Sequence, residues 1–182
     1  MKLKSLLKKS GYLSISFKRL KTNHIQVKAE INSVKGVFII DTGASNSCID
    51  LKLCDFYNIS YEKSSEKASS ATDQISNTMI SKKNQIKIGK WFKKNMTIVL
   101  FDMTFINKTL NEHGIDSVSG IIGSDLLKKG KAIIDYSENK LFLKSLISRD
   151  FFISLFISPS TGFSSNSLTF NRNPTDSFPS II

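Results

Sequence analysis

The alternation of apolar and polar positions predicts a β-hairpin in the first quarter of the chain. Residues 24–31 (H-I-Q-V-K-A-E-I) alternate with a period of two, as a half-buried strand does. Residues 32–36 supply turn residues, and residues 37–40 (V-F-I-I) form a short apolar run. We therefore expect a hairpin whose second strand ends at Asp41. A carboxylate at the end of a buried strand is costly to desolvate unless it has a partner, which makes this position a candidate site.

A second sharp pattern lies at residues 120–130. Gly120, Ile121 and Ile122 are expected to form a buried strand that ends at Gly123. Ser124 stands where a helix N-cap is expected, so we predict a strand that turns directly into a short helix. The apolar residues of that helix are Leu126 and Leu127, and Gly130 ends it.

Other segments complete a mostly-β chain. Further strands are expected at residues 86–88 and 96–101, and residues 131–136 and 141–143 should pair as a closing hairpin around a turn at 137–139. Residues 13–17 alternate weakly, as in a short strand or an ordered arm. Two segments stay open: residues 48–56 suit a helix or a strand, and residues 104–113 suit a helical or irregular passage.

Composition divides the chain into three parts. We expect a basic N-terminal arm at residues 1–22, one folded domain at 23–147, and a flexible tail rich in Ser and Asn with scattered Phe at 148–182. The formal charge of +11 raises the question of nucleic acid, but no nucleic-acid-binding motif accompanies it, so solvated basic faces are the favoured interpretation. Cys48 and Cys54 match no metal or disulfide pattern. No stretch is apolar enough to span a bilayer, and we expect a cytoplasmic protein with no membrane partner.

The two sharp patterns together resemble the retropepsin-like aspartic protease family, including its bacterial single-domain members. The first is D-T-G-A-S at residues 41–45 after an apolar strand. The second is I-I-G at residues 121–123, 80 residues further on, before the short helix. The resemblance covers roughly residues 23–144. It implies a mostly-β fold, a small closed barrel with one short C-terminal helix.

The resemblance also implies a chemistry that the residue types explain. Peptide hydrolysis by carboxylates needs one carboxylate as general base toward water and one as general acid toward the substrate. Only Asp41 lies in an Asp-Thr-Gly sequence, so the second carboxylate should come from another copy of the chain in a homodimer. The expected partners are therefore a second subunit and a protein or peptide substrate. Neither a metal nor a cofactor is expected.

Other residues are expected to support Asp41. Gly43 should permit a tight turn, and by resemblance Thr42 contributes its hydroxyl to a network that joins the two active-site loops. Ala44, Ser45, Ile122 and Gly123 complete the supporting set. Residues 62–78 are polar and small, and they are the candidate for a flap over the substrate, although they contain no glycine. The candidate flap and substrate residues are Ser70, Ala71, Thr72 and Asp73.

Two other functions remain open from the sequence. The first is a peptide-binding or regulatory module that keeps the retropepsin fold without catalysis, because a fold does not guarantee an activity. The second is a basic protein that binds polyanions, with an affinity that falls steeply as salt rises and does not depend on Asp41.

Overall fold

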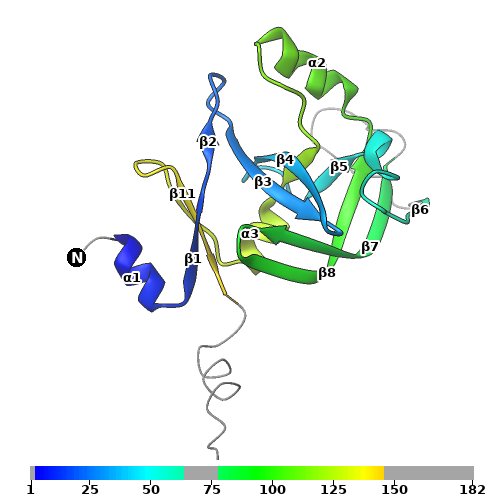
Figure 1. Ribbon diagram of the computed structural model, residues 1–182. Helices are drawn as coiled ribbons and strands as arrows, with labels where there is room; N and C mark the ends of the chain where they lie inside the picture. Colours follow the sequence, from blue (N-terminus) through cyan, green and yellow to red (C-terminus); the bar gives the residue numbers. More distant parts are fainter. Residues whose placement is uncertain (1–2, 64–77, 146–182) are drawn as a thin grey trace, which may run out of the picture.

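The structure, a computed structural model, describes residues 3–63 and 78–145, and its centre is a closed β-barrel (Figure 1). The strands follow one another around the barrel in the order β3, β4, β9, β5, β8 and β7, and β7 pairs back onto β3. Two short strands extend the sheet, β2 beside β3 and β6 beside β7. These strands are β2 (Lys18–Arg19), β3 (Ile25–Ile31), β4 (Val34–Ile40), β5 (Cys48–Asp50), β6 (Glu62–Lys63), β7 (Met79–Ile88), β8 (Trp91–Phe101) and β9 (Gly120–Ile122). The mostly-β barrel expected from the sequence is confirmed.

The β3–β4 hairpin is confirmed, but its turn is shorter than predicted. Asn32 and Ser33 both have positive φ, 47° and 73°, which is the conformation of a two-residue hairpin turn. Strand β4 therefore begins at Val34, and Gly36 lies within the strand. A Cβ on Gly36 would lie 1.9 Å from the hydroxyl oxygen of Tyr57. This glycine is needed because Tyr57 packs directly on the strand, and it is not a turn residue.

A second sheet of three strands packs against the barrel. Strand β11 (Lys140–Lys144) lies in its middle, between β1 (Tyr12–Ser16) and β10 (Ile133–Asp135). The closing hairpin predicted at residues 131–143 is thus confirmed as β10 and β11. Ile15 from β1 joins Leu141 and Leu143 in the main hydrophobic core. Residues of the expected N-terminal arm therefore share a core with the barrel. The expected tail at 148–182 lies outside the described residues.

The described residues include three α-helices, where the sequence predicted one. Helix α3 (Ser124–Lys129) is the predicted one, and it buries Leu126 and Leu127 in the main core. Its N-cap is Gly123, so the N-cap expected at Ser124 is wrong by one residue. Helix α1 (Leu3–Lys9) is short and buries only Leu7. The three lysines of α1 obscure its apolar spacing in the sequence. None of the described helices is long and apolar enough to cross a membrane.

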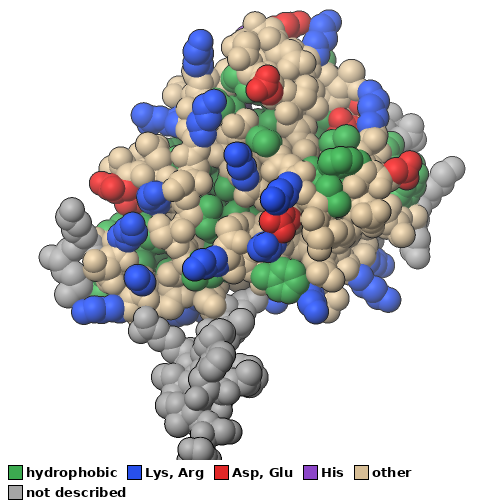
Figure 2. Space-filling view, viewed as in Figure 1, with side chains coloured by type: hydrophobic (Ala, Val, Ile, Leu, Met, Phe, Trp, Pro, Cys, Tyr) green, Lys and Arg blue, Asp and Glu red, His purple; other side chains and the backbone are tan. Residues whose placement is uncertain are grey.

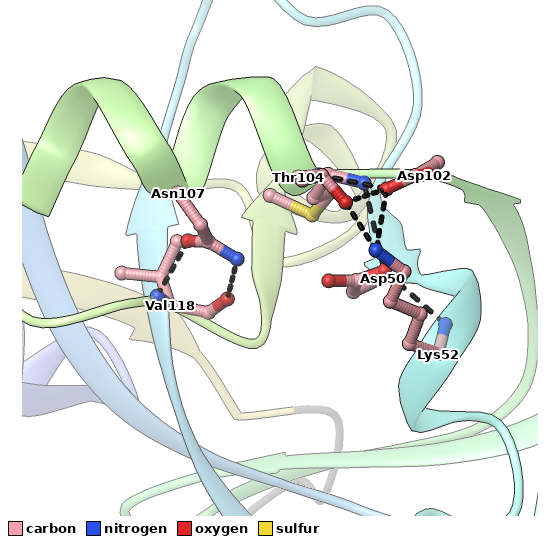
Figure 3. Close-up of polar contacts among 7 residues, drawn as sticks. Asp50, Lys52, Asp102, Thr104, Asn107 and Val118 are labelled. Atoms are coloured by element: carbon pink, nitrogen blue, oxygen red, sulfur yellow. Dashed lines mark hydrogen bonds and ion pairs between the residues drawn. The ribbon is translucent and has the colours of Figure 1, made fainter.

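Helix α2 (Thr104–Glu112) projects from one end of the barrel (Figure 1). The segment at 104–113, which the sequence left open between helical and irregular, is therefore helical. Figure 3 shows how it is attached: the Asn107 amide group accepts from the Val118 backbone N–H at 2.9 Å and donates to the Val118 carbonyl at 3.2 Å. The other open segment, at 48–56, forms β5 followed by a 3-10 turn, η1 (Leu51–Leu53). The Lys52 side chain on η1 forms an ion pair of 3.4 Å with Asp102, just before α2.

Candidate active site

The Asp41 carboxylate lies where β4 leaves the barrel. Phe38, Ile39 and Ile40 are buried, and Asp41, the next residue, is exposed. Its backbone N–H donates to the Ile122 carbonyl at 3.0 Å, which ties it to the parallel strand β9. The strand end therefore fixes the backbone of Asp41, while the carboxylate avoids the desolvation cost that a buried position would impose.

The turn after Asp41 orients its carboxylate. The Gly43 backbone N–H donates to Asp41 Oδ1 at 2.8 Å. Gly43 has no positive φ, so the reason for a glycine here is space: a Cβ on Gly43 would lie 3.2 Å from the same Oδ1. Such a contact is tight, and a side chain at position 43 would press on the carboxylate. One carboxylate oxygen is thus engaged by its own loop.

Strand β9 and helix α3 support the loop after Asp41 from one side. The Ser124 backbone N–H donates to the Ala44 carbonyl at 2.8 Å, and the Ser124 hydroxyl donates to the Ser45 carbonyl at 3.3 Å. Gly123 allows this close approach, because a Cβ there would lie 2.6 Å from the backbone carbonyl of Asn46. The structure therefore brings the D-T-G-A-S segment and the I-I-G segment into direct contact.

A hydrogen-bonded pair that sequence reasoning missed joins the same two segments. Asp125 Oδ1 accepts from both the backbone N–H and the hydroxyl of Ser47, each at 2.8 Å. The Ser47 hydroxyl oxygen accepts in turn from the Gly123 N–H at 3.0 Å. Ser47 is buried, so these bonds satisfy groups that water does not reach. The sequence signal that could have identified Asp125 is its place in the first turn of the predicted helix, where the helix dipole favours a carboxylate.

The other candidate residues differ in their placement. Thr42 and Ser45 are exposed and Ala44 is half-buried, and the Thr42 hydroxyl makes no hydrogen bond with another described residue. Ile122 is buried in the main core. The candidate flap residues Ser70, Ala71, Thr72 and Asp73 lie outside the described residues. The Asp41 loop thus presents an exposed carboxylate and an exposed hydroxyl side by side in the sequence.

Neither cysteine has the properties of a nucleophile. Cys48 and Cys54 are buried and free. Burial raises the pKa of the Cys48 thiol to about 12, and the nearby carboxylates of Asp125 and Asp41 also raise it. The pKa of Cys54 is raised as well, chiefly by burial. Both thiols therefore stay protonated near neutral pH. Across residues 3–63 and 78–145, no group of three or more His, Cys, Asp or Glu side chains is arranged to hold a metal ion.

Comparison with known proteins settles the family. The sequence model of the family described as aspartyl protease matches residues 27–126, more than half of the 182 residues, and this span contains both the Asp41 loop and Gly123. The chain belongs to the aspartyl protease family. Comparison of this family member with curated protein sequences found no match.

Solved structures show which fold this aspartyl protease family member has. A retropepsin-like aspartic protease from Rickettsia conorii is similar with a TM-score of 0.50 and 22% identity, over 74% of this chain and 91% of that one. EIAV protease, complexed with the inhibitor HBY-793, has a TM-score of 0.44 and 16% identity, over 62% of this chain and 88% of that one. The retroviral protease-like domain of Ddi1 from Leishmania major has a TM-score of 0.43 and 16% identity, over 70% of this chain and 97% of that one. The Rickettsia structure and the barrel topology show a retropepsin-like fold, as the sequence suggested.

Proposed function

We propose that the protein is an aspartic endopeptidase that works as a homodimer, with one Asp41 from each subunit in a single active site. Membership of the aspartyl protease family and the retropepsin-like fold support aspartic protease activity. The single observation that carries the proposal is the position of Asp41. Its backbone is fixed by β9, one of its oxygens is held by Gly43, and its carboxylate is exposed at the surface of one chain.

The proposed reaction uses two carboxylates that share one proton. The ionised Asp41 takes a proton from water as the water oxygen bonds to the scissile carbonyl carbon. The protonated Asp41 gives its proton to the carbonyl oxygen, which yields a neutral tetrahedral diol. The two groups then act in reverse: the first protonates the amide nitrogen, the second takes a hydroxyl proton, and the C–N bond breaks. Both carboxyl groups return to their starting states, and no covalent intermediate forms.

The sequence contains one Asp-Thr-Gly, at Asp41, and so offers one carboxylate of this kind in each chain. Asp135 also follows two apolar residues but is not followed by Thr-Gly. It is engaged in the turn between β10 and β11, where Oδ1 accepts from the Ser137 hydroxyl at 2.6 Å and from the Ser137 N–H at 3.0 Å. The pKa of Asp135 is lowered, first by the Ser137 hydroxyl. This carboxylate has an evident structural role, which supports taking the second catalytic group from another subunit.

The three-stranded sheet suggests where the subunits meet. Strand β11 has neighbours on both sides, β1 and β10, so residues 141–143 cannot pair with a partner chain. Strand β10 lies at an edge of this sheet and has backbone groups free to pair with a second copy. We therefore propose β10 as part of the dimer interface.

The test is cleavage of a diverse peptide mixture by wild type and Asp41→Asn between about pH 3.5 and 7, the range expected for a proton-sharing carboxylate pair. Asp55→Asn is a matched control, because Asp55 is also exposed and lies outside the loop. We expect wild type and Asp55→Asn to cut, and Asp41→Asn to be inactive while keeping its fold and dimer. Cleavage by purified Asp41→Asn would refute the proposal. A folded wild-type dimer that binds peptides without cutting them would favour the non-catalytic module.

A further inference from the structure

An open groove lies between helix α1 and the β1–β11 pair, away from the Asp41 loop. Its volume is about 860 Å³, within the range of about 300–1,000 Å³ typical of ligand sites. Leu13 contributes apolar surface to it, and no acidic residue lines it. Basic side chains surround it, and they are Lys4, Lys8, Lys9, Lys90, Lys140 and Lys144. Figure 2 shows basic side chains across the face of the molecule that carries α1 and β1, with few acidic ones among them.

The charge of this groove is not compensated. The ion pairs within residues 3–63 and 78–145 join Lys52 to Asp102 and Lys87 to Glu30, and none involves a groove lysine. Two groove lysines have neutral neighbours instead. Lys140 Nζ donates to the Ser16 hydroxyl at 2.6 Å, and Lys144 Nζ lies 5.6 Å from the centre of the Tyr12 ring.

Six ammonium groups around one cavity repel one another, and an anionic ligand would relieve that repulsion. Lys4, Lys8 and Lys9 of α1 and Lys140 and Lys144 of β11 line the groove from two different elements. Several ammonium groups that face one groove add their attraction for an anion. The groove is therefore suited to carboxylate groups that enter it.

We propose that this groove binds an acidic segment of a polypeptide. The size of the groove suits a short segment, and its apolar surface at Leu13 suits side chains between the acidic ones. Nucleic acid is less suited, because base stacking needs open aromatic faces: Phe142 is 1% exposed, and Lys144 Nζ lies over the half-buried Tyr12 ring. A membrane is less suited because a planar surface does not reach side chains inside a groove.

This inference goes beyond the proposed function and does not depend on it, because no residue of the Asp41 loop lines the groove. If the protein is a protease, the groove would recruit substrates or regulators that carry an acidic segment. Such a segment would bind equally well to wild type and to Asp41→Asn. Failure of cleavage and failure of groove binding are therefore distinguishable.

The test is fluorescence anisotropy of fluorescein-labelled decaglutamate with the full chain. The groove variant carries Lys4→Gln, Lys8→Gln and Lys90→Gln. The matched control carries Lys21→Gln, Lys82→Gln and Lys108→Gln, which are exposed lysines away from the groove. Both variants lose three positive charges, so they lose the same long-range attraction. We expect the groove variant to raise the Kd by about tenfold and the control to leave it nearly unchanged.

Three results would overturn the proposal. Equal weakening in the two variants would mean that only net charge matters. Absence of decaglutamate binding to wild type would exclude the site outright. The third result is that wild type binds oligo-thymidine of equal charge, or phosphatidylserine vesicles, more tightly than decaglutamate, and that only the groove variant loses this binding. That result would assign the groove to a nucleic acid or a membrane. Circular dichroism of each variant shows whether it is folded.

Discussion

One oxygen of Asp125 accepts two hydrogen bonds from Ser47, from the backbone N–H and from the hydroxyl, both at 2.8 Å. This pair joins α3 to the loop that begins at Asp41. It also connects to Gly123, whose N–H donates to the Ser47 hydroxyl. The position of the candidate catalytic loop therefore depends on a carboxylate that is not itself a candidate for catalysis.

Replacing Asp125 should loosen this loop. Asp125→Ala leaves the buried Ser47 N–H without a partner, and we expect the free energy of unfolding to fall by about 1–3 kcal/mol. Asp125→Asn keeps a carbonyl acceptor and should cost less. Urea unfolding measures both, with the exposed Asp116→Ala as control. A double-mutant cycle with Ser47→Ala should show strong coupling, and additive effects would mean that the two side chains act separately.

The two glycines near Asp41 should respond differently to a methyl group. Gly123→Ala places a Cβ 2.6 Å from the Asn46 backbone, which cannot move without distorting the loop, so we expect a loss of about 1–3 kcal/mol in stability together with loss of activity. Gly43→Ala places a Cβ 3.2 Å from Asp41 Oδ1, the end of a side chain that can rotate. We expect it to lower activity with little loss of stability. Thermal unfolding and peptide cleavage measure the two effects, and the reverse ranking would contradict this account.

Cys48 should make the protein less stable at alkaline pH. Its pKa is raised to about 12 from an ordinary 9.0, so above pH 9 the unfolded chain releases a proton that the folded chain keeps. Stability is therefore fully present below about pH 9 and falls progressively between pH 9 and 12. Cys48→Ala should flatten this fall. The measurement is urea unfolding at pH 8, 9 and 10, and identical pH dependence in wild type and Cys48→Ala would contradict the expectation.

Much of the fold could be predicted because local patterns and tertiary packing agree. The hairpin before Asp41, the strand before Gly123 and the closing hairpin all combine apolar periodicity with turn residues, and each forms as expected. The assignment of Gly36 to a turn failed because a glycine can also serve close packing, here against Tyr57. Sequence alone cannot separate these two reasons for a glycine.

The candidate site was only partly predictable. Asp41, Gly43 and Gly123 could be selected because they form a recognisable pair of short motifs. Ser47 and Asp125 were missed because their role depends on a contact between residues 78 positions apart, and neither residue type stands out in its own segment. The basic groove was missed for the same reason, since its lysines come from three distant parts of the chain.

The central claim is that two chains share one active site, and subunit mixing tests it most directly. A fixed amount of wild type is incubated with increasing Asp41→Asn, and peptide cleavage is followed at each ratio. Random exchange at equal amounts should leave about half of the wild-type chains in wild-type dimers, so activity should fall to about half and decline further with excess variant. Excess Asp55→Asn should add activity instead. Activity that stays constant in excess Asp41→Asn, with subunit exchange shown by native mass spectrometry, would contradict the shared site.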